Sequence, residues 1–230
     1  MTDFLGDWQA WRDARERRLS SPDGWLAITA IHWLTAAPER FDDVPGAWSA
    51  EGGKITVTLA VGETLSLDGD DLAEGEHVLG RVDEDGVTVA FGDAIAEVAD
   101  RDGATIVRPR HPDSPLLRAY RGTPCYPPDP RWVLPARFAP YAEPDGSLWI
   151  LFRDATSGIT TYPANRQLVA PAPSPDGATE LDFNRAFNMP CAYTDFATCP
   201  VAPPQNTLPF AVEAGEQDPA SAGRGAARGA

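Results

Sequence analysis

The stretch that decides the fold is residues 54–107, KITVTLAVGETLSLDGDDLAEGEHVLGRVDEDGVTVAFGDAIAEVADRDGATIV. Apolar and polar residues alternate in short runs, as in KITVTL (54–59) and GVTVAFG (86–92), and Asp-Gly or Glu-Gly pairs separate the runs. Alternation with a period of two is typical of strands with one buried face, and Gly-containing pairs favour tight turns. The stretch therefore predicts a mainly β fold of antiparallel, hairpin-rich sheets, arranged as a sandwich or a partly open barrel.

Upstream of the hairpins, residues 3–20 predict an N-terminal amphipathic helix. Phe4, Trp8 and Trp11 recur at helical spacing, and charged residues take most of the other positions. The apolar run at 24–34 that follows is compatible with a buried strand or with a short helix-like segment.

The remaining sequence suggests how the domain is organised. A first β half spans residues 24–142, and a second β half spans 145–216. In the second half, SLWILF (147–152) is the most apolar strand-like run, which predicts a central strand. We expect the helix and both halves to form a single β-rich domain over residues 1–216. Residues 217–230 lack bulky apolar groups and predict a disordered tail.

The composition excludes several partners. The chain has 230 residues and a formal net charge of −15, and nucleic-acid binding depends on Lys and Arg that neutralise phosphates, so we expect no nucleic-acid partner. No apolar run reaches the roughly 18 residues of a membrane helix. Residues 1–19 lack the apolar centre and cleavage site of a signal peptide. Three cysteines do not suit a disulfide framework. These features predict a cytoplasmic protein without a membrane partner.

Polar residues gather in two stretches of the second β half, RDATSGITTY (153–162) and DFNRAFNMPCAYTDFATCPVAPPQNTLP (182–209). Polar side chains at strand ends commonly form binding sites, so we expect the two stretches to meet beside one hollow. The candidate ligand-binding residues are Arg153, Asp154, Ser157, Thr161, Tyr162, Asp182, Asn184, Arg185, Asn188, Cys191, Cys199 and Asn206.

In this interpretation the protein binds a small molecule and has a polar, hydrolase-like site. Asp154 and Asp182 are suited to acid/base work or to polar anchoring, and Arg153 or Arg185 is suited to clamping an anionic group. The Asn side chains would donate hydrogen bonds. Neither a substrate nor a cofactor follows from these residue types, and whether the protein is an enzyme stays open.

Other interpretations of the same residues remain. Asn, Asp and Pro also satisfy backbone groups in irregular segments, so the motif would then only stabilise a non-catalytic domain. Cys191 and Cys199 would suit thiol chemistry beside a cation, but they lack the short spacing of a zinc knuckle, and we predict no metal. His111, Asp113 and Ser114 have the composition of a catalytic triad, but neighbours in one turn do not point at one another.

Several segments resemble a bacterial family of unknown function, the domain of unknown function numbered 1684 (DUF1684). They are DATSGITTY (154–162), DFNRAFNMPCAYTDFATCPVAPPQNTLP (182–209), EAGE (213–216), DGWLAITAIHWL (23–34) and residues 107–141. The resemblance implies a cytosolic, β-rich protein and supplies no biochemistry. This sequence departs from the family where Met189 replaces the first Pro of an N-P-P-C turn, where Ala30 replaces a Gly, and where residues 141–146 are shortened by a pair of strands.

Overall fold

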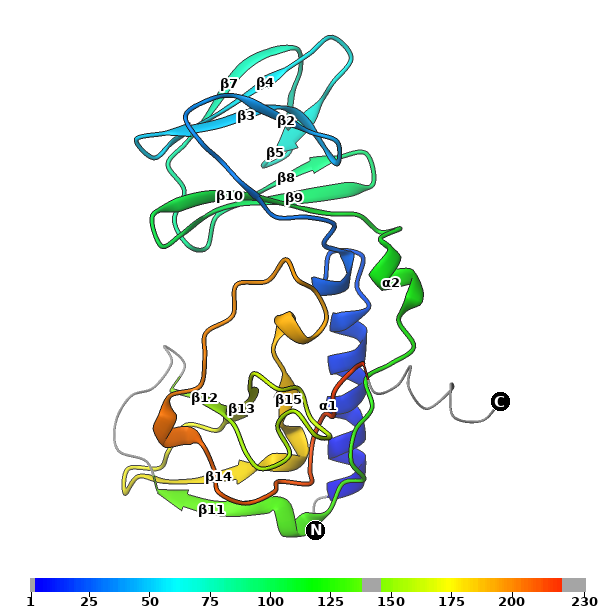
Figure 1. The fold of residues 1–230 in the computed structure, drawn as a ribbon, viewed down its shortest axis with the longest axis vertical. Helices are drawn as coiled ribbons and strands as arrows, with labels where there is room; N and C mark the ends of the chain where they lie inside the picture. The colour runs from blue at the N-terminus through cyan, green and yellow to red at the C-terminus, as the bar shows by residue number, and fades with distance from the viewer. Residues whose placement is uncertain (1–2, 138–145, 221–230) are drawn as a thin grey trace. The chain divides into compact units, whose positions relative to one another are not determined.

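The computed structural model describes residues 3–137 and 146–220, which divide into two compact units (Figure 1). The sandwich unit consists of residues 19–120. The terminal unit combines residues 3–18 with the described residues from 121 to 220. The predicted single domain over 1–216 stays a prediction. The shortened segment, apart from Gly146, and tail residues 221–230 lie outside the described residues.

The sandwich unit contains two antiparallel sheets, as the alternating sequence predicts. One sheet has the strand order β2-β3-β4-β7, and the other has the order β1-β10-β9-β8-β5-β6. The strand bounds are β1 His32–Trp33, β2 Glu39–Phe41, β3 Val44–Glu51, β4 Lys54–Leu59, β5 Leu65–Leu67, β6 Asp70–Leu72, β7 Gly75–Gly80, β8 Val87–Phe91, β9 Ala94–Arg101 and β10 Ala104–Arg110. No closed barrel occurs among the described residues.

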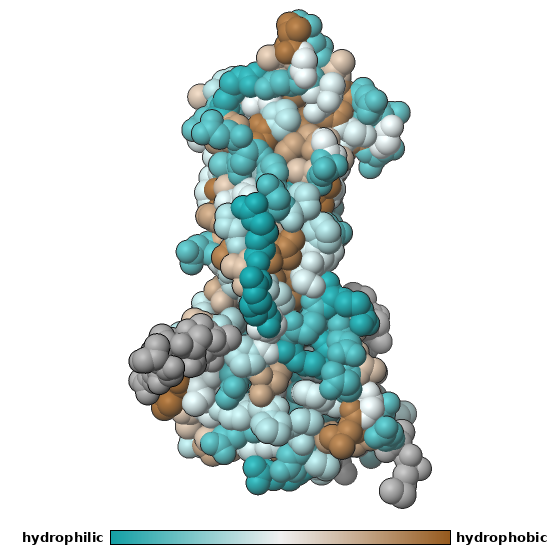
Figure 2. Space-filling view, turned by 90° about the vertical axis from the view of Figure 1, so that its right-hand side faces the viewer, coloured by the Kyte–Doolittle hydropathy of each residue, from teal (hydrophilic) through white to brown (hydrophobic). Residues whose placement is uncertain are grey.

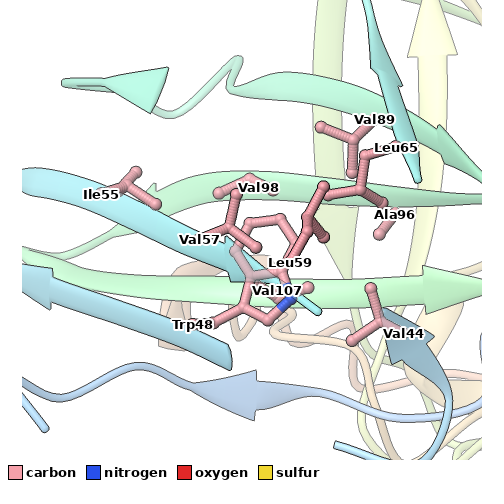
Figure 3. Packing of buried hydrophobic residues seen from close by; sticks show 10 residues of the cluster. All are labelled: Val44, Trp48, Ile55, Val57, Leu59, Leu65, Val89, Ala96, Val98 and Val107. Atoms are coloured by element: carbon pink, nitrogen blue, oxygen red, sulfur yellow. The ribbon is translucent and has the colours of Figure 1, made fainter. Parts of the chain in front are cut away.

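The buried residues of these strands form one core between the two sheets (Figure 3). Trp48 and Val57 come from the four-stranded sheet, and Val89, Val98 and Val107 come from the six-stranded sheet. All five are 0% exposed. Because alternate residues of a strand face opposite sides, the period-two pattern buries every second residue of strands such as β4. The strand β10 differs, because its residues from Thr105 to Pro109 are all buried.

One turn of this unit requires glycine. Gly86 precedes β8 and has a φ of 69°, a conformation that L-residues rarely adopt. A Cβ atom there would lie 2.6 Å from the carbonyl oxygen of Val98. The Asp-Gly pair at 85–86 therefore fixes both the turn and the close approach of the neighbouring strand.

The apolar run at 24–34 contains both of the structures that its sequence allowed, a short helical turn and a strand. It forms a 3-10 turn, η1 (Trp25–Ala27), and then the short strand β1. A short helix, α2 (Pro115–Ala119), follows β10.

The terminal unit contains the predicted N-terminal helix, α1 (Phe4–Leu19). Trp8 and Trp11 are partly buried, and Gln9, Asp13 and Arg17 are exposed, so the predicted helix is confirmed and one of its faces is more buried than the other. The Trp11 ring meets the edge of Phe187 at 6.3 Å between centroids.

Two small sheets complete the terminal unit. Their strand orders are β11-β14 and β12-β13-β15. The bounds are β11 Val133–Arg137, β12 Leu148–Phe152, β13 Arg166–Ala170, β14 Ala178–Asp182 and β15 Phe187–Asn188, with 3-10 turns η2 Pro130–Trp132, η3 Phe183–Arg185, η4 Pro190–Ala192 and η5 Pro204–Asn206. The prediction that 147–152 forms a central strand was wrong, because β13 takes the middle position.

The second edge of β12, which pairs with no strand of its sheet, explains that difference. Near its end, the edge is covered by irregular chain and not by another strand: the backbone N of Arg153 donates to the carbonyl of Asn206, and the backbone N of Leu208 donates to the carbonyl of Arg153. An apolar strand can therefore be buried without a strand on each side.

The described residues contain no helix long and apolar enough to cross a membrane. The face in Figure 2 carries mainly hydrophilic and weakly polar residues, with hydrophobic residues scattered among them.

Candidate functional site

Asp154, the first predicted acid, is buried just after β12 and binds other parts of the chain. Its Oδ2 accepts hydrogen bonds from Nη2 of Arg166 at 2.7 Å and from the backbone N of Val212 at 3.2 Å. Burial lowers the pKa of Arg166, and the Asp154 carboxylate opposes that shift. The two side chains are 0% and 1% exposed, so this ion pair is sealed from solvent.

Three other predicted residues lie around the same turn. The hydroxyl oxygens of Thr161 and Thr156 are 2.9 Å apart, and Oγ of Ser157 accepts from the backbone N of Asp154 at 3.2 Å. Arg153 is exposed. The hydroxyl groups of Ser157 and Thr161 therefore stabilise the turn itself.

Asp182, Asn184 and Arg185 form a second group around the 3-10 turn η3. Oδ1 of Asp182 caps the turn by accepting from the backbone N of Asn184 at 3.1 Å, and Oδ2 lies 3.1 Å from Nε of Arg185. The Asn184 amide bonds both backbone groups of Asp129, at 2.8 Å and 2.9 Å. Asp182 is the last residue of β14, because its side chain caps η3 and the chain leaves the strand there.

Asn188 belongs to a third group, built around a buried carboxylate that we did not predict. Oε2 of Glu216 accepts from the backbone N of Asn188 at 2.7 Å and from the hydroxyl of Tyr193 at 2.9 Å. Its Oε1 accepts from Nε of Arg15 at 3.1 Å and pairs with Arg12 at 3.4 Å. The Glu216 side chain is 0% exposed.

The electrostatics of this third group follow from burial. Burial raises the pKa of the Tyr193 hydroxyl, and the Glu216 carboxylate raises it further. For Arg15, burial lowers the pKa, but Glu216 and Tyr193 outweigh burial and raise it. The group therefore favours a charged Arg15 beside a neutral Tyr193.

Tyr162, Cys191 and Cys199 form a fourth group. The Tyr162 hydroxyl donates to the Cys191 carbonyl at 2.8 Å, and the backbone N of Cys191 donates to Sγ of Cys199 at 3.3 Å. Burial, followed by Cys191, raises the pKa of Tyr162 to about 12. Both cysteines are free thiols packed against an apolar cluster with Leu151 and Met189. Asn206 donates to the carbonyl of Leu151 in the same cluster.

The predicted residues thus form four groups, and most of their polar atoms bond to the chain itself. Sequence reasoning missed the charged partners Arg15, Arg166 and Glu216. For Glu216 the sequence held one indication of importance, because this acid lies in the short motif EAGE (213–216) beside the expected tail. No cluster of three or more His, Cys, Asp or Glu suited to a metal ion occurs in the described ranges.

A pocket of about 510 Å³ lies in the sandwich unit, and we name it the His111 pocket. Such a volume suits a small molecule. It forms where the β2–β3 hairpin, the segment before β5, the end of β8 and the segment after β10 come together. Its lining residues are Phe41, Asp42, Asp43, Val44, Pro45, Gly62, Glu63, Thr64, Phe91, Gly92 and His111.

Asp43 is held in place by His32 and Thr29, which do not line the pocket. Its Oδ1 lies 2.7 Å from Nε2 of His32, and its Oδ2 accepts from the Thr29 hydroxyl at 2.8 Å. Burial raises the pKa of Asp43, but the hydrogen bonds from His32 and Thr29 outweigh burial and lower it. The His32 ring also stacks on Phe41 at 3.9 Å. One pocket wall is therefore rigid and carries an ionised carboxylate.

His111 contacts the backbone of Asp43 and not its side chain. Its Nε2 lies 2.8 Å from the backbone carbonyl of Asp43, which only accepts, so Nε2 carries a proton. The ring meets Phe91 edge to face at 5.5 Å. Ser114 caps α2 by accepting from the backbone N of Leu117. His111 and Ser114 thus have separate roles and form no catalytic pair.

The lining residue Glu63 forms an ion pair with Arg40. Arg40 contacts both carboxylate oxygens, at 2.7 Å and 2.9 Å, and the backbone N of Ala60 donates to one of them. The Arg40 hydrogen bond, first among several, lowers the pKa of Glu63 to about 2. Glu63 is thereby ionised, and its charge is compensated.

Comparisons with known proteins agree with the sequence motifs of the terminal unit. Residues 141–217 match the model of the family described as "Protein of unknown function (DUF1684)". No curated protein matches the chain. The solution NMR structure of an uncharacterized protein from Haloarcula marismortui is similar, at 23% sequence identity over 94% of this chain and 97% of that chain, with a TM-score of 0.35. The family match spans the polar stretches at 154–162 and 182–209, so the predicted resemblance is confirmed over residues 141–217, which are similar to DUF1684, a family of unknown function.

Proposed function

We propose that this protein binds a small organic molecule in the His111 pocket. The observation that carries the proposal is the pocket itself, which has about 510 Å³ of space between two Phe rings, an imidazole and fixed carboxylates. Apolar walls with a few oriented polar groups are typical of small-molecule sites. No nucleophile with an activating base is part of this proposal, so we infer binding and no reaction.

A ligand screen tests the proposal. A fragment library of cations, anions and neutral compounds is added to ¹⁵N-labelled protein, and amide shifts are followed by NMR. We expect binders to shift the amides of Phe41, Gly92 and His111. Thr64→Trp fills the pocket and should abolish these shifts, whereas Thr88→Trp, on an exposed strand position of the same unit, should not. Absence of any binder at millimolar concentration, or hits indifferent to Thr64→Trp, would contradict the proposal.

We infer that the polar residues of 153–162 and 182–206 mainly stabilise the terminal unit. Support comes from their side-chain bonds to the chain, such as those between the Asn184 amide and the backbone of Asp129 and the one from the Asn188 amide to the carbonyl of Gln217. Truncating a buried, hydrogen-bonded Asn costs about 1–3 kcal/mol. Asn184→Ala and Asn188→Ala should therefore lower the urea midpoint.

The small-molecule or hydrolase-like site predicted for those two stretches stays a separate proposal. It would gain support if Asp182→Ala left the melting temperature unchanged and removed a ligand found in the same screen. A cytoplasmic location is likewise our proposal, and cell fractionation tests it.

A further inference from the structure

We propose that the ligand of the His111 pocket is a small organic cation, such as an amine or a quaternary ammonium compound; this inference rests on the proposed function. The first argument is charge. The lining contains three acids, Asp42, Asp43 and Glu63, and no Lys or Arg among the described residues. The chain as a whole carries a formal charge of −15, which adds to the attraction of cations and the repulsion of anions.

The second argument concerns which of these charges a ligand would meet. Arg40 lies outside the lining and compensates Glu63 through two short contacts. Asp42 is exposed at the pocket, and Asp43 is partly buried in its wall. Each Asp43 oxygen accepts one bond from a side chain outside the pocket lining and keeps further acceptor capacity. A ligand cation would therefore face Asp42 and Asp43.

The third argument concerns the aromatic walls. Phe41 and Phe91 both line the pocket, and each is fixed by a histidine: Phe41 by stacking on His32 and Phe91 by the edge contact with His111. His32 covers one face of Phe41, which leaves its other face and the Phe91 ring for a ligand. Aromatic faces near carboxylates attract ammonium groups and repel anions. Apolar rings also favour an organic cation over a hydrated metal ion, and no group of three metal-type ligands lies among the described residues.

A matched set of probes tests the inference. Choline, tetramethylammonium and a primary alkylamine are titrated into labelled protein beside 3,3-dimethylbutan-1-ol, which has the shape of choline without its charge, and 3,3-dimethylbutanoate, an anion of similar shape. We expect the best cation to bind about tenfold more tightly than the neutral isostere and the anion not to bind. Affinity for the cation should fall as NaCl is raised, because salt screens an exposed carboxylate.

Two variants sharpen the test. Asp42→Asn removes an exposed lining charge and should weaken cation binding several-fold while leaving the neutral isostere unchanged. Asp85→Asn, an exposed acid of the same unit outside the pocket lining, makes the same change in net charge and should leave both affinities unchanged.

The outcomes separate the two proposals. If neutral or anionic fragments shift the pocket amides and no cation binds more tightly, the cation inference is wrong and the pocket remains a binding site. If no fragment or probe shifts those amides, both are wrong. Equal weakening by Asp42→Asn and Asp85→Asn would also overturn the inference, because attraction would then come from net charge alone.

Discussion

At the scale of single residues, the buried carboxylate of Glu216 has the most partners in the terminal unit. It receives Arg12, Arg15, Tyr193 and the backbone of Asn188. Glu216→Gln would leave the buried Arg15 without its counter-charge, and such losses cost about 3 kcal/mol or more. Urea denaturation should show this drop.

The control for that change lies three residues earlier. Glu213 is exposed, and Glu213→Gln makes the same chemical substitution. We expect it to change stability by less than about 0.5 kcal/mol. Similar curves for the two variants would mean that the Glu216 cluster contributes little to stability.

A second residue, Cys125, predicts a pH dependence. Burial, the largest cause, raises the pKa of its thiol from 9.0 to about 12. In the unfolded chain the thiol ionises at lower pH than in the folded chain, so stability is full below pH 9 and is lost as pH rises toward 12. Between about pH 8 and pH 10, ionisation of this thiol in the unfolded chain should lower the free energy of unfolding by about 1 kcal/mol.

Cys125→Ala isolates that contribution. The substitution removes the titrating thiol. The unfolding free energy of the variant should therefore fall less over the same pH range than that of the unsubstituted chain. Guanidinium chloride denaturation at about pH 8, 9 and 10 measures both slopes. Parallel slopes would show that Cys125 is not the group responsible.

At the scale of elements, the segment from Val212 to Asp218 ties the terminal unit together although it forms no regular strand. Gly215 lies within it at a φ of 74°. A Cβ atom there would lie 2.4 Å from the carbonyl oxygen of Ala186 and 2.9 Å from that of Phe183. Gly215→Ala therefore combines backbone strain with a collision against backbone, and we expect a loss of several kcal/mol.

Gly158 offers a control in the same unit. It has a φ of 81°, and a Cβ atom there would lie 3.5 Å from Cβ of Pro163, an ordinary contact. Gly158→Ala should thus cost only the backbone strain, about 1 kcal/mol. Thermal unfolding of both variants compares the two costs, and equal shifts would contradict the proposed close packing around Gly215.

Local patterns allowed much of the fold to be predicted. The helix at Phe4–Leu19 and the hairpins of the sandwich unit follow from periodicity and Gly turns, which act over a few residues. The position of β12 at a sheet edge was missed, because irregular chain from residues 206–208 covers that edge. No periodic pattern marks such a segment.

The site was harder to predict for a similar reason. Composition identified the polar residues at 153–162 and 182–206, but their partner Arg15 comes from the N-terminal helix, and Arg166 and Glu216 lie outside both stretches. The His111 pocket joins four segments that are each ordinary in sequence. Spatial convergence of this kind has no local signature.

At the scale of the whole molecule, the net charge of −15 predicts a response to salt. Like charges repel one another in the compact state, and about 0.1 M salt screens exposed charges over about 10 Å. Sealed pairs such as Asp154 with Arg166 are screened much less. We expect the melting temperature to rise by several degrees between about 10 mM and about 300 mM NaCl, as measured by differential scanning calorimetry.

A charge-reduced variant is the matched test of that mechanism. Asp85, Asp93 and Glu180 are exposed, and changing them together to Asn, Asn and Gln lowers the negative charge by three without touching a buried pair. Its melting temperature should start higher at low salt and rise less as NaCl is added, because less repulsion remains to be screened. KCl at equal ionic strength should act like NaCl. A fall in melting temperature with salt would instead mean that exposed ion pairs such as Arg40 with Glu63 outweigh the repulsion.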